Sequence, residues 1–304
     1  MKSQHKSFSR FAVVMMGAML VASSCTKPEL EDDFPKGDPP PIGNYVNSSE
    51  IAPADLVAFF PFDGTYADSK GAVPGGTLTG RGGGFTQGKK GQAYQAGDSS
   101  FIAYTTAGPL AGLTSFTVSM WINTLKHASG AQGVFAVARQ DGSFWGNFFM
   151  LIESTGPSEN RMLAKVHFEK NVTPPVLNAE HWMETSGDKK LINDMYGGWR
   201  HIAYAYDETT STFAMYANGN KVAFTDEESK RLASPGVPLG ALAFKDATRF
   251  IVGGYQNHLG KPPFNGLEDW MKTYTGRLDE LRIYKKALSG SEIIALFQLE
   301  KQGR

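Results

Sequence analysis

The chain has 304 residues, with 30 Lys and Arg balancing 30 Asp and Glu, so its formal net charge is zero. That balance gives no basic field of the kind that attracts nucleic acid, and we expect no nucleic-acid partner. A single cysteine excludes a disulfide framework, and a chain of this length can bury a full core without one.

The first 24 residues have the pattern of an export signal. Lys2, Lys6 and Arg10 precede an apolar run that is too short to span a bilayer. The segment Val21-Ala-Ser-Ser-Cys25 resembles a bacterial lipobox, which implies cleavage before Cys25 and a lipid anchor on that residue. The alternative is a plain secreted protein with a leftover thiol.

Residues 25–53 are predicted to be a disordered acidic and proline-rich tether. Its acidic cluster, Pro28-Glu-Leu-Glu-Asp-Asp33, resembles the surface-export tag of Bacteroidetes-type lipoproteins. The resemblance implies an outer-membrane lipoprotein exposed on the cell surface, whereas a solvated linker remains the alternative. Residues 54–304 are then one domain.

From Asp55 onward, short apolar runs recur between glycine-rich breaks, which is typical of an all-β sandwich. Asn218 and Gly219 supply the two positive-φ positions of a type I′ turn, so 213–217 should pair with 221–224. A capping box, Ser289-Gly-Ser-Glu292, opens one short C-terminal helix. The strands are predicted at 56–62, 91–94, 101–104, 116–123, 134–139, 148–153, 163–168, 199–206, 212–217, 221–224, 249–253 and 276–284.

Four blocks of the sequence resemble the laminin G-like, concanavalin A-like lectin/glucanase domain in the order which that family has. They are Leu56-Val-Ala-Phe-Phe-Pro-Phe-Asp-Gly64, Ser115-Phe-Thr-Val-Ser-Met-Trp-Ile122, the run from Trp199 to Phe224, and Tyr274-Thr-Gly-Arg-Leu-Asp-Glu-Leu-Arg-Ile-Tyr284. The resemblance implies a two-sheet antiparallel jelly-roll sandwich. Because such folds host lectins, enzymes and adhesion modules alike, it does not specify the function.

The resemblance also implies a structural Ca²⁺ ion near the join of the first and last strands. The matching positions are Asp63, Asp68 and Asp279, which backbone carbonyls would supplement. Alternatively, Asp63 and Asp68 are turn residues that bond their own backbone, and Asp279 pairs with a neighbouring arginine.

Two long insertions, 171–198 and 254–273, interrupt the strand pattern, and long ordered loops are usually functional. Aromatic rings flanked by polar groups suit sugars, whose C–H faces stack on rings while hydroxyls bond amides, acids and arginine. The candidate ligand-binding residues are Trp145, Arg139, Trp182, Tyr196, Tyr255, Asn257, His258 and Trp270. Each aromatic could instead be a buried loop anchor. We assign Trp121, Trp199 and His201 to structure.

No catalytic motif is recognised. The Glu-x-Asp-x-x-Glu strand of glucanases on related sandwiches does not occur, and Asp279 and Glu280, as neighbours on a strand, should point to opposite faces. A carboxylate pair assembled from Glu153, Glu169 and Glu184 stays open, because spacing does not report it.

These observations favour a non-catalytic, carbohydrate-binding, lipid-anchored surface protein that serves as an accessory to polysaccharide capture or uptake. The alternatives are a protein-binding adhesion module, and a glycoside hydrolase or lyase with an unrecognised site. A recess lined by aromatic rings and polar groups would favour a glycan, whereas a broad apolar patch would favour a protein partner.

Overall fold

A computed structural model describes residues 39–156, 158–187 and 191–304, and Pro40–Arg304 forms a compact unit. The predicted signal at 1–24 and the predicted lipid anchor Cys25 lie outside the described residues. Within them, no helix combines the length and apolarity needed to cross a membrane.

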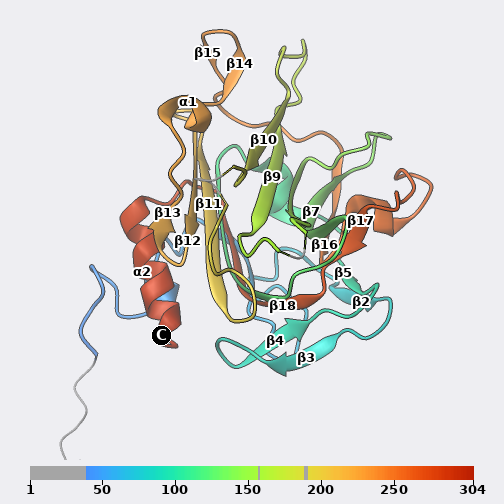
Figure 1. The fold of residues 1–304 in the computed structure, drawn as a ribbon. Helices are drawn as coiled ribbons and strands as arrows, with labels where there is room; N and C mark the ends of the chain where they lie inside the picture. The colour runs from blue at the N-terminus through green and yellow to red at the C-terminus, as the bar shows by residue number, and fades with distance from the viewer. Residues whose placement is uncertain (1–38, 157, 188–190) are drawn as a thin grey trace, which may run out of the picture. The chain divides into compact units, whose positions relative to one another are not determined.

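The unit is built on two large antiparallel sheets, as the sequence predicts (Figure 1). The first, which we name sheet 1, runs in the order β13 (Asn220–Lys221), β12 (Thr212–Ala217), β11 (Arg200–Asp207), β6 (Phe116–Thr124), β18 (Gly276–Tyr284), β4 (Gln92–Gln95) and β3 (Gly84–Gln87). β1 (Leu56–Phe60) also pairs with β18. Sheet 1 therefore unites the first and the last strand of the fold.

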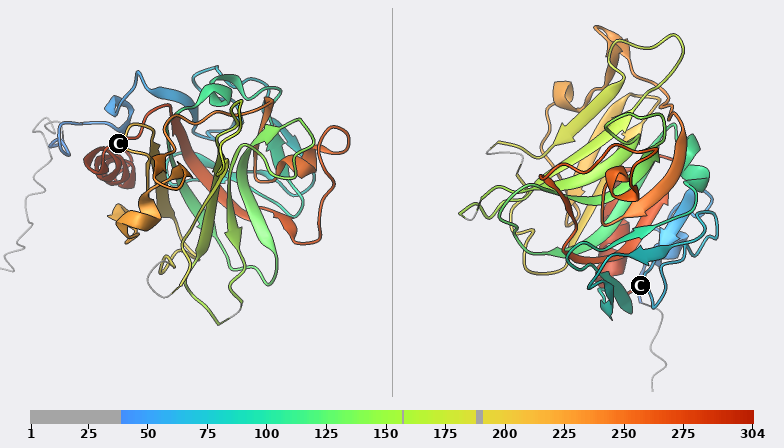
Figure 2. Two further views of the ribbon diagram at one scale, coloured as in Figure 1. Left: turned by 90° about the horizontal axis from the view of Figure 1, so that it is seen from above. Right: turned by 90° about the vertical axis from the view of Figure 1, so that its right-hand side faces the viewer.

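Sheet 2 runs in the order β10 (Glu180–Glu184), β9 (Leu163–Glu169), β8 (Phe148–Glu153), β7 (Ala131–Arg139), β16 (Ala247–Val252), β5 (Phe101–Ala103) and β2 (Thr77–Thr79). A short strand, β17 (Met271–Thr273), adds to β7 in parallel. A separate hairpin of β14 (Leu232–Ser234) and β15 (Val237–Pro238) projects at one end (Figures 1 and 2).

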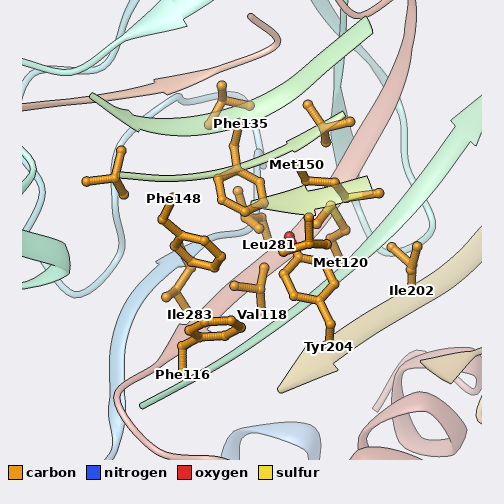
Figure 3. Packing of buried hydrophobic residues seen from close by; sticks show 14 of the residues in the cluster. Phe116, Val118, Met120, Phe135, Phe148, Met150, Ile202, Tyr204, Leu281 and Ile283 are labelled. Atoms are coloured by element: carbon orange, nitrogen blue, oxygen red, sulfur yellow. The ribbon is translucent and has the colours of Figure 1, made fainter. Parts of the chain in front are cut away.

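The core lies between the sheets and follows from the alternation of side chains along each strand. Phe116, Val118 and Met120 of β6 face Phe148 and Met150 of β8 within one buried cluster (Figure 3). Tyr204, from β11, and Ile283, from β18, belong to the same cluster. Burial of these inner faces fixes the register of both sheets.

One long helix, α2 (Gly290–Lys301), packs on the outer face of sheet 1 beside β12 and β13 (Figure 1). The predicted capping box is present, with Ser289 and Glu292 bonding each other's backbone N–H groups. Ile293 and Leu296 are buried, whereas Ile294 is 38% exposed. The remaining helices are short: α1 (Asp226–Ser229), η1 (Ser48–Glu50), η2 (Gly108–Gly112) and η3 (Gln256–Leu259).

The compact unit begins earlier than the predicted boundary between residues 53 and 54. Ile51 is buried in the cluster that joins α2 to sheet 1, and Ser48 accepts a hydrogen bond from Arg282. The guanidinium of Arg304 also donates to the carbonyls of Pro40 and Val46. Residues 40–53 are therefore part of the domain and not of a disordered tether, because the chain end gains apolar burial and polar partners there.

The sequence correctly predicts the long central strands of both sheets, whereas the strands that it misses are short, with two to five residues each. The Asn-Gly turn is confirmed, since Asn218 and Gly219 have φ of 49° and 77° and Ala217 pairs with Asn220. However, the partner strand ends at Lys221 and does not reach Phe224. The sequence prediction missed β2, β3, β10, β14, β15 and β17. Of these, β10 lies in the first insertion and β17 in the second.

β18 contains a bulge that overturns one inference about its acids. Leu278 and Leu281 both belong to the core, so the residues between them break strict alternation, and Glu280 has a φ of 50°. Its carboxylate bonds Arg282, while Asp279 accepts the backbone N–H of Glu280. Neighbouring acids on this strand are thus not forced onto opposite faces, because a bulge adds a residue without a partner.

Candidate functional site: an aromatic pocket on sheet 2

Side chains on the outer face of sheet 2 line up in rows across β8, β9 and β10. Phe149 lies opposite His167, and His167 lies opposite Trp182, with ring centroids 4.8 and 4.6 Å apart. Two residues further along the strands, the next row contains Lys165 and Glu184. Because strands alternate with period two, the aromatic row and the charged row share one face.

Two loop tryptophans extend the aromatic row: Trp145 packs on its rings, and Trp270 packs on Trp145. Trp145 lies between β7 and β8, where Gln256 donates hydrogen bonds to the carbonyls of Ser143 and Phe144. Trp270 directly precedes β17, and its carbonyl accepts a hydrogen bond from Ala131. The Trp145 ring centroid is 5.1 Å from that of Trp182 and 5.8 Å from that of Trp270. Three segments distant in sequence thus bring their indoles together.

The three indoles border a cavity of about 410 Å³. They are half-buried, so each ring has an exposed portion beside the cavity. The complete lining comprises Ala131, Trp145, Leu151, Glu153, Lys165, Trp182, Glu184 and Trp270. Predicted ligand residues from two different insertions and from the β7–β8 loop therefore share one recess.

A lysine between two carboxylates forms the charged part of the lining. The Lys165 Nζ atom is 2.5 Å from Glu153 Oε2 and 3.2 Å from Glu184 Oε2. Burial lowers the pKa of Lys165, but the two ion pairs outweigh this effect and the net shift is upward. The side chains remain 24% to 44% exposed, so water and a ligand can reach them.

Three of the predicted ligand residues lie near the pocket without lining it. Tyr255 is buried beneath Trp270 and donates its hydroxyl proton to the carbonyl of Ala131. Asn257 is also buried and donates to the carbonyl of Gly266. Both are corrected to loop anchors, because their polar atoms are used by the backbone. His258 lines a separate hollow beside Met271 and accepts a hydrogen bond from Tyr255 N.

Two further predicted residues lie elsewhere. Tyr196 packs against the main core and bridges to Thr124, so it does not line this pocket. Arg139 is at the far end of β7, where its guanidinium binds Asp141 at 2.8 Å and Glu169 at 2.9 Å. Glu169, one of the candidate carboxylates, is fully buried in this ion pair and does not face the cavity.

The three aspartates predicted to bind Ca²⁺ each accept backbone N–H groups. The Asp68 carboxylate accepts four, from Phe59, Lys70, Ala72 and Val73. Asp63 accepts one from Gln92, and Asp279 accepts those of Lys89, Lys90 and Glu280. Burial, the largest effect, raises the pKa of Asp279 to about 8 despite these donors.

Among the described residues, no group of three or more His, Cys, Asp or Glu side chains could hold a metal. The arrangement matches the alternative role of Asp68 as a turn residue, because N–H donors occupy the oxygens that Ca²⁺ would need. Ca²⁺ binding by these aspartates stays a prediction.

Ala131, Leu151 and Lys165 line the pocket without having been predicted, and for the charged one, Lys165, the sequence contains a signal. The segment Glu180-His-Trp-Met-Glu184 alternates buried His181 and Met183 with outward Trp182 and Glu184, which is the period of a strand. Pairing it with the alternating β9 segment would have placed Lys165 beside Glu184. The proline and glycine residues around this segment indicate a loop instead and obscure the strand pattern.

Comparisons with known proteins agree on the architecture. Residues 96–294 match a family model described as the concanavalin A-like lectin/glucanases superfamily. No curated protein matches the sequence.

Among solved structures, domain 4 of AbnA, a GH43 extracellular arabinanase from Geobacillus stearothermophilus, in complex with arabinotriose, has a TM-score of 0.51 and 21% identity, covering 80% of this chain and 98% of that one. A second solved structure is that of botulinum neurotoxin type C, a toxin described as dependent on interaction with two ganglioside molecules for cell entry. It has a TM-score of 0.53 and 12% identity to this chain. The match covers 83% of this chain and 52% of the toxin chain, so this chain spans about half of that protein. At these identities the structural likeness shows the fold.

Proposed function

The chain belongs to the concanavalin A-like lectin/glucanases superfamily, and on that premise we propose that its pocket on sheet 2 binds a glycan without cleaving it. The observation that carries the proposal is the convergence of Trp145, Trp182 and Trp270 around one cavity with a charged lining. Family and fold alone do not specify a ligand.

The geometry suits a sugar better than a purely apolar molecule. Indole faces can stack on the C–H side of a pyranose or furanose ring, while Glu153, Lys165 and Glu184 offer both acceptors and donors to its hydroxyls. Because Lys165 already pairs with Glu153 and Glu184, an uncharged sugar ring can enter the pocket without leaving any of these three charges unpaired.

Two of the solved structures similar to this chain are described with carbohydrates: arabinotriose in the arabinanase domain, and gangliosides in the type C neurotoxin. They support the proposal at the level of a shared scaffold. The pocket residues of this chain are the stronger support, because they come from its own sequence.

We further propose that Cys25 carries a lipid anchor that holds the domain at the outer surface of the outer membrane, as an accessory to polysaccharide capture or uptake. The support is the lipobox-like segment and the acidic residues after it. Metabolic labelling with a radioactive fatty acid should mark the wild-type protein and not Cys25→Ser. Equal labelling of both proteins would disprove the anchor.

A glycan array probed with the purified protein tests the sugar proposal, with a Trp182→Ala variant as the matched probe. Trp182 is chosen because its ring is half-exposed and its removal leaves the backbone of β10 intact. We expect the wild-type protein to bind a neutral glycan and Trp182→Ala to lose that signal while it still unfolds cooperatively, at a melting temperature lowered by the loss of its ring contacts. Absence of binding to every glycan, together with a tight protein ligand, would favour the adhesion alternative.

A second candidate, glycoside hydrolysis, is favoured by one observation: two carboxylates contact the same ammonium, so Glu153 and Glu184 lie close together. Retaining glycosidases place two carboxyl groups roughly 5 Å apart. However, Lys165 occupies both, and a general acid or nucleophile must be able to act on substrate. Release of reducing sugar from the bound glycan, abolished by Glu153→Gln with binding retained, would establish hydrolysis and overturn the non-catalytic proposal.

A further inference from the structure

A second pocket, of about 570 Å³, lies on the outer side of sheet 1 beside α2. Three rings and three cations line it: Trp121, Trp199 and Phe297, with Lys89, Arg200 and Lys301. They come from the β3–β4 turn, β6, the start of β11 and α2. None of the described residues that line this pocket is acidic, in contrast to the carboxylate-containing pocket on sheet 2.

Trp199 is not explained by the fold. Its strand motif predicts a structural role, but its side chain is half-exposed and it belongs to none of the hydrophobic clusters found among the described residues. Trp121, by contrast, is buried and donates its Nε1–H to Glu300. A large apolar ring with exposed area and no core function is the kind of surface group that ligands use.

The cations around this ring have no carboxylate partner among the described residues. Arg200 donates to two backbone carbonyls, those of Asp194 and Trp199, which orient its guanidinium without neutralising its charge. Lys89 donates to the carbonyl of Lys301 at 2.8 Å, and its ammonium is 5.1 Å from the Trp121 ring. These contacts hold Lys89 at the pocket without neutralising it.

The two glutamates near this pocket, Glu280 and Glu300, are both ion-paired with a buried arginine. Arg282 bonds Glu280 at 2.6 Å and Glu300 at 2.7 Å, and Glu300 also accepts the indole N–H of Trp121. The Trp121 indole therefore contacts this buried network through its N–H group and Lys89 through its ring. The C-terminal carbonyl of α2 that would repel an anion is already bonded by Lys89.

We propose that this pocket is a second ligand site, specific for an acidic sugar unit that bears a carboxylate or a sulfate. The ring of the sugar stacks on the indole of Trp199, and Arg200 with Lys301 binds the anionic group. Arg suits this task because its planar guanidinium can form two parallel hydrogen bonds with an oxyanion. The site is independent of the pocket on sheet 2, whose two carboxylates disfavour acidic sugars.

Isothermal titration calorimetry of the purified protein with oligogalacturonate, with a sulfated galactan oligosaccharide and with a neutral galactan oligosaccharide tests the site. We expect binding of an acidic oligosaccharide that weakens as NaCl is raised from 0.05 to about 0.5 M, because salt screens exposed charges. The two acidic probes distinguish carboxylate from sulfate as the recognised group. If neither acidic oligosaccharide binds, the proposal is overturned.

Two variants and one control separate this site from the first. Arg200→Gln and Trp199→Ala should each weaken acidic-sugar binding by about tenfold or more, as expected for loss of a charge-assisted bond or a stacking platform. Trp145→Ala, in the pocket on sheet 2, should leave that affinity unchanged. If Trp145→Ala abolishes acidic-sugar binding and Arg200→Gln does not, acidic sugars bind in the first pocket and the second-site proposal fails. Thermal melting shows whether each variant is folded.

Discussion

The indole of Trp145 meets the indole of Trp182 edge to face, with centroids 5.1 Å apart and ring planes at 81°. One residue comes from the β7–β8 loop and the other from strand β10. Such edge contacts stabilise the pair by about 0.5–1.5 kcal/mol beyond burial. The contact therefore positions the loop ring against a strand, which gives the pocket a wall that is formed before a ligand arrives.

Replacing Trp145 with alanine should weaken binding of a neutral glycan by about tenfold, the size expected for a central aromatic contact. The variant loses both a stacking surface and the support for Trp182. Trp199→Ala is the matched control, because it removes a half-exposed indole from the opposite sheet. Calorimetric affinities that fall equally for both variants would show that the sheet 2 pocket is not the neutral-glycan site.

Asp68→Ala should destabilise the protein by roughly 2–4 kcal/mol, since one buried carboxylate accepts four backbone N–H groups. Asp63→Ala, which removes an exposed acceptor of a single N–H group, should cost much less. Urea unfolding measures both free energies. The loss for Asp68→Ala should be the same with Ca²⁺ and with chelator; stabilisation of the wild type by Ca²⁺ that this variant lacks would instead establish the metal site.

His201→Gln should make the protein less sensitive to acid. Burial, with Arg282 adding to it, lowers the pKa of His201 to about 3, so the folded state keeps this imidazole neutral. A depressed pKa gives stability that is complete above the unfolded pKa of about 6.5 and is lost as pH falls toward 3. Between pH 7 and pH 4 the wild type should lose roughly 3 kcal/mol through this residue.

Glu300 lies 4.0 Å from His201, and its effect on the pH dependence of stability is opposite to that of the histidine. Burial raises its pKa to about 7, so its contribution to stability is complete below its unfolded pKa and is lost as pH rises through 7. The comparison of His201→Gln with the wild type isolates the histidine, because both proteins retain Glu300. Parallel curves of unfolding free energy against pH would contradict a neutral buried His201.

Gly219→Ala should destabilise the protein more than Gly236→Ala. Both glycines have similar positive φ, 77° and 74°, which alanine adopts at a cost of about 1 kcal/mol. A Cβ atom at Gly219 would also lie 2.7 Å from Phe297 Cδ1, whereas one at Gly236 would meet nothing within 4 Å. Denaturation midpoints of the two variants measure the difference, and equal losses would show that Phe297 moves freely away from the Asn-Gly turn.

Elements whose pattern is local could be predicted from the sequence. The alternating apolar residues of 116–123 and the continuous apolar run of 148–153 predict strands, and both strands are present. The Asn218-Gly219 turn and the capping box at Ser289 are likewise predicted from local residues and confirmed. Each depends on residues within one segment. The edge strand β10 was missed because its proline- and glycine-containing surroundings weaken the local signal.

The candidate site could be predicted only in part. Trp145, Trp182 and Trp270 were expected to bind ligand and line the pocket, but Tyr255 and Asn257, chosen by the same criterion, are buried. Whether a ring in a loop faces solvent or supports the loop depends on what packs against it from elsewhere in the chain. The residues that flank a ring in the sequence therefore do not reveal whether the ring is exposed or buried.

The sequence by itself determined the sandwich of this protein, because strand alternation and turn residues act over short distances and burial enforces the register. Only the tertiary structure decided which side chains meet in the two candidate pockets. It placed Lys165 between two glutamates of neighbouring strands and Arg200 beside cations from two distant segments. Sites of this kind depend on which strands become neighbours, and neighbours far apart in the chain have no spacing that a sequence displays.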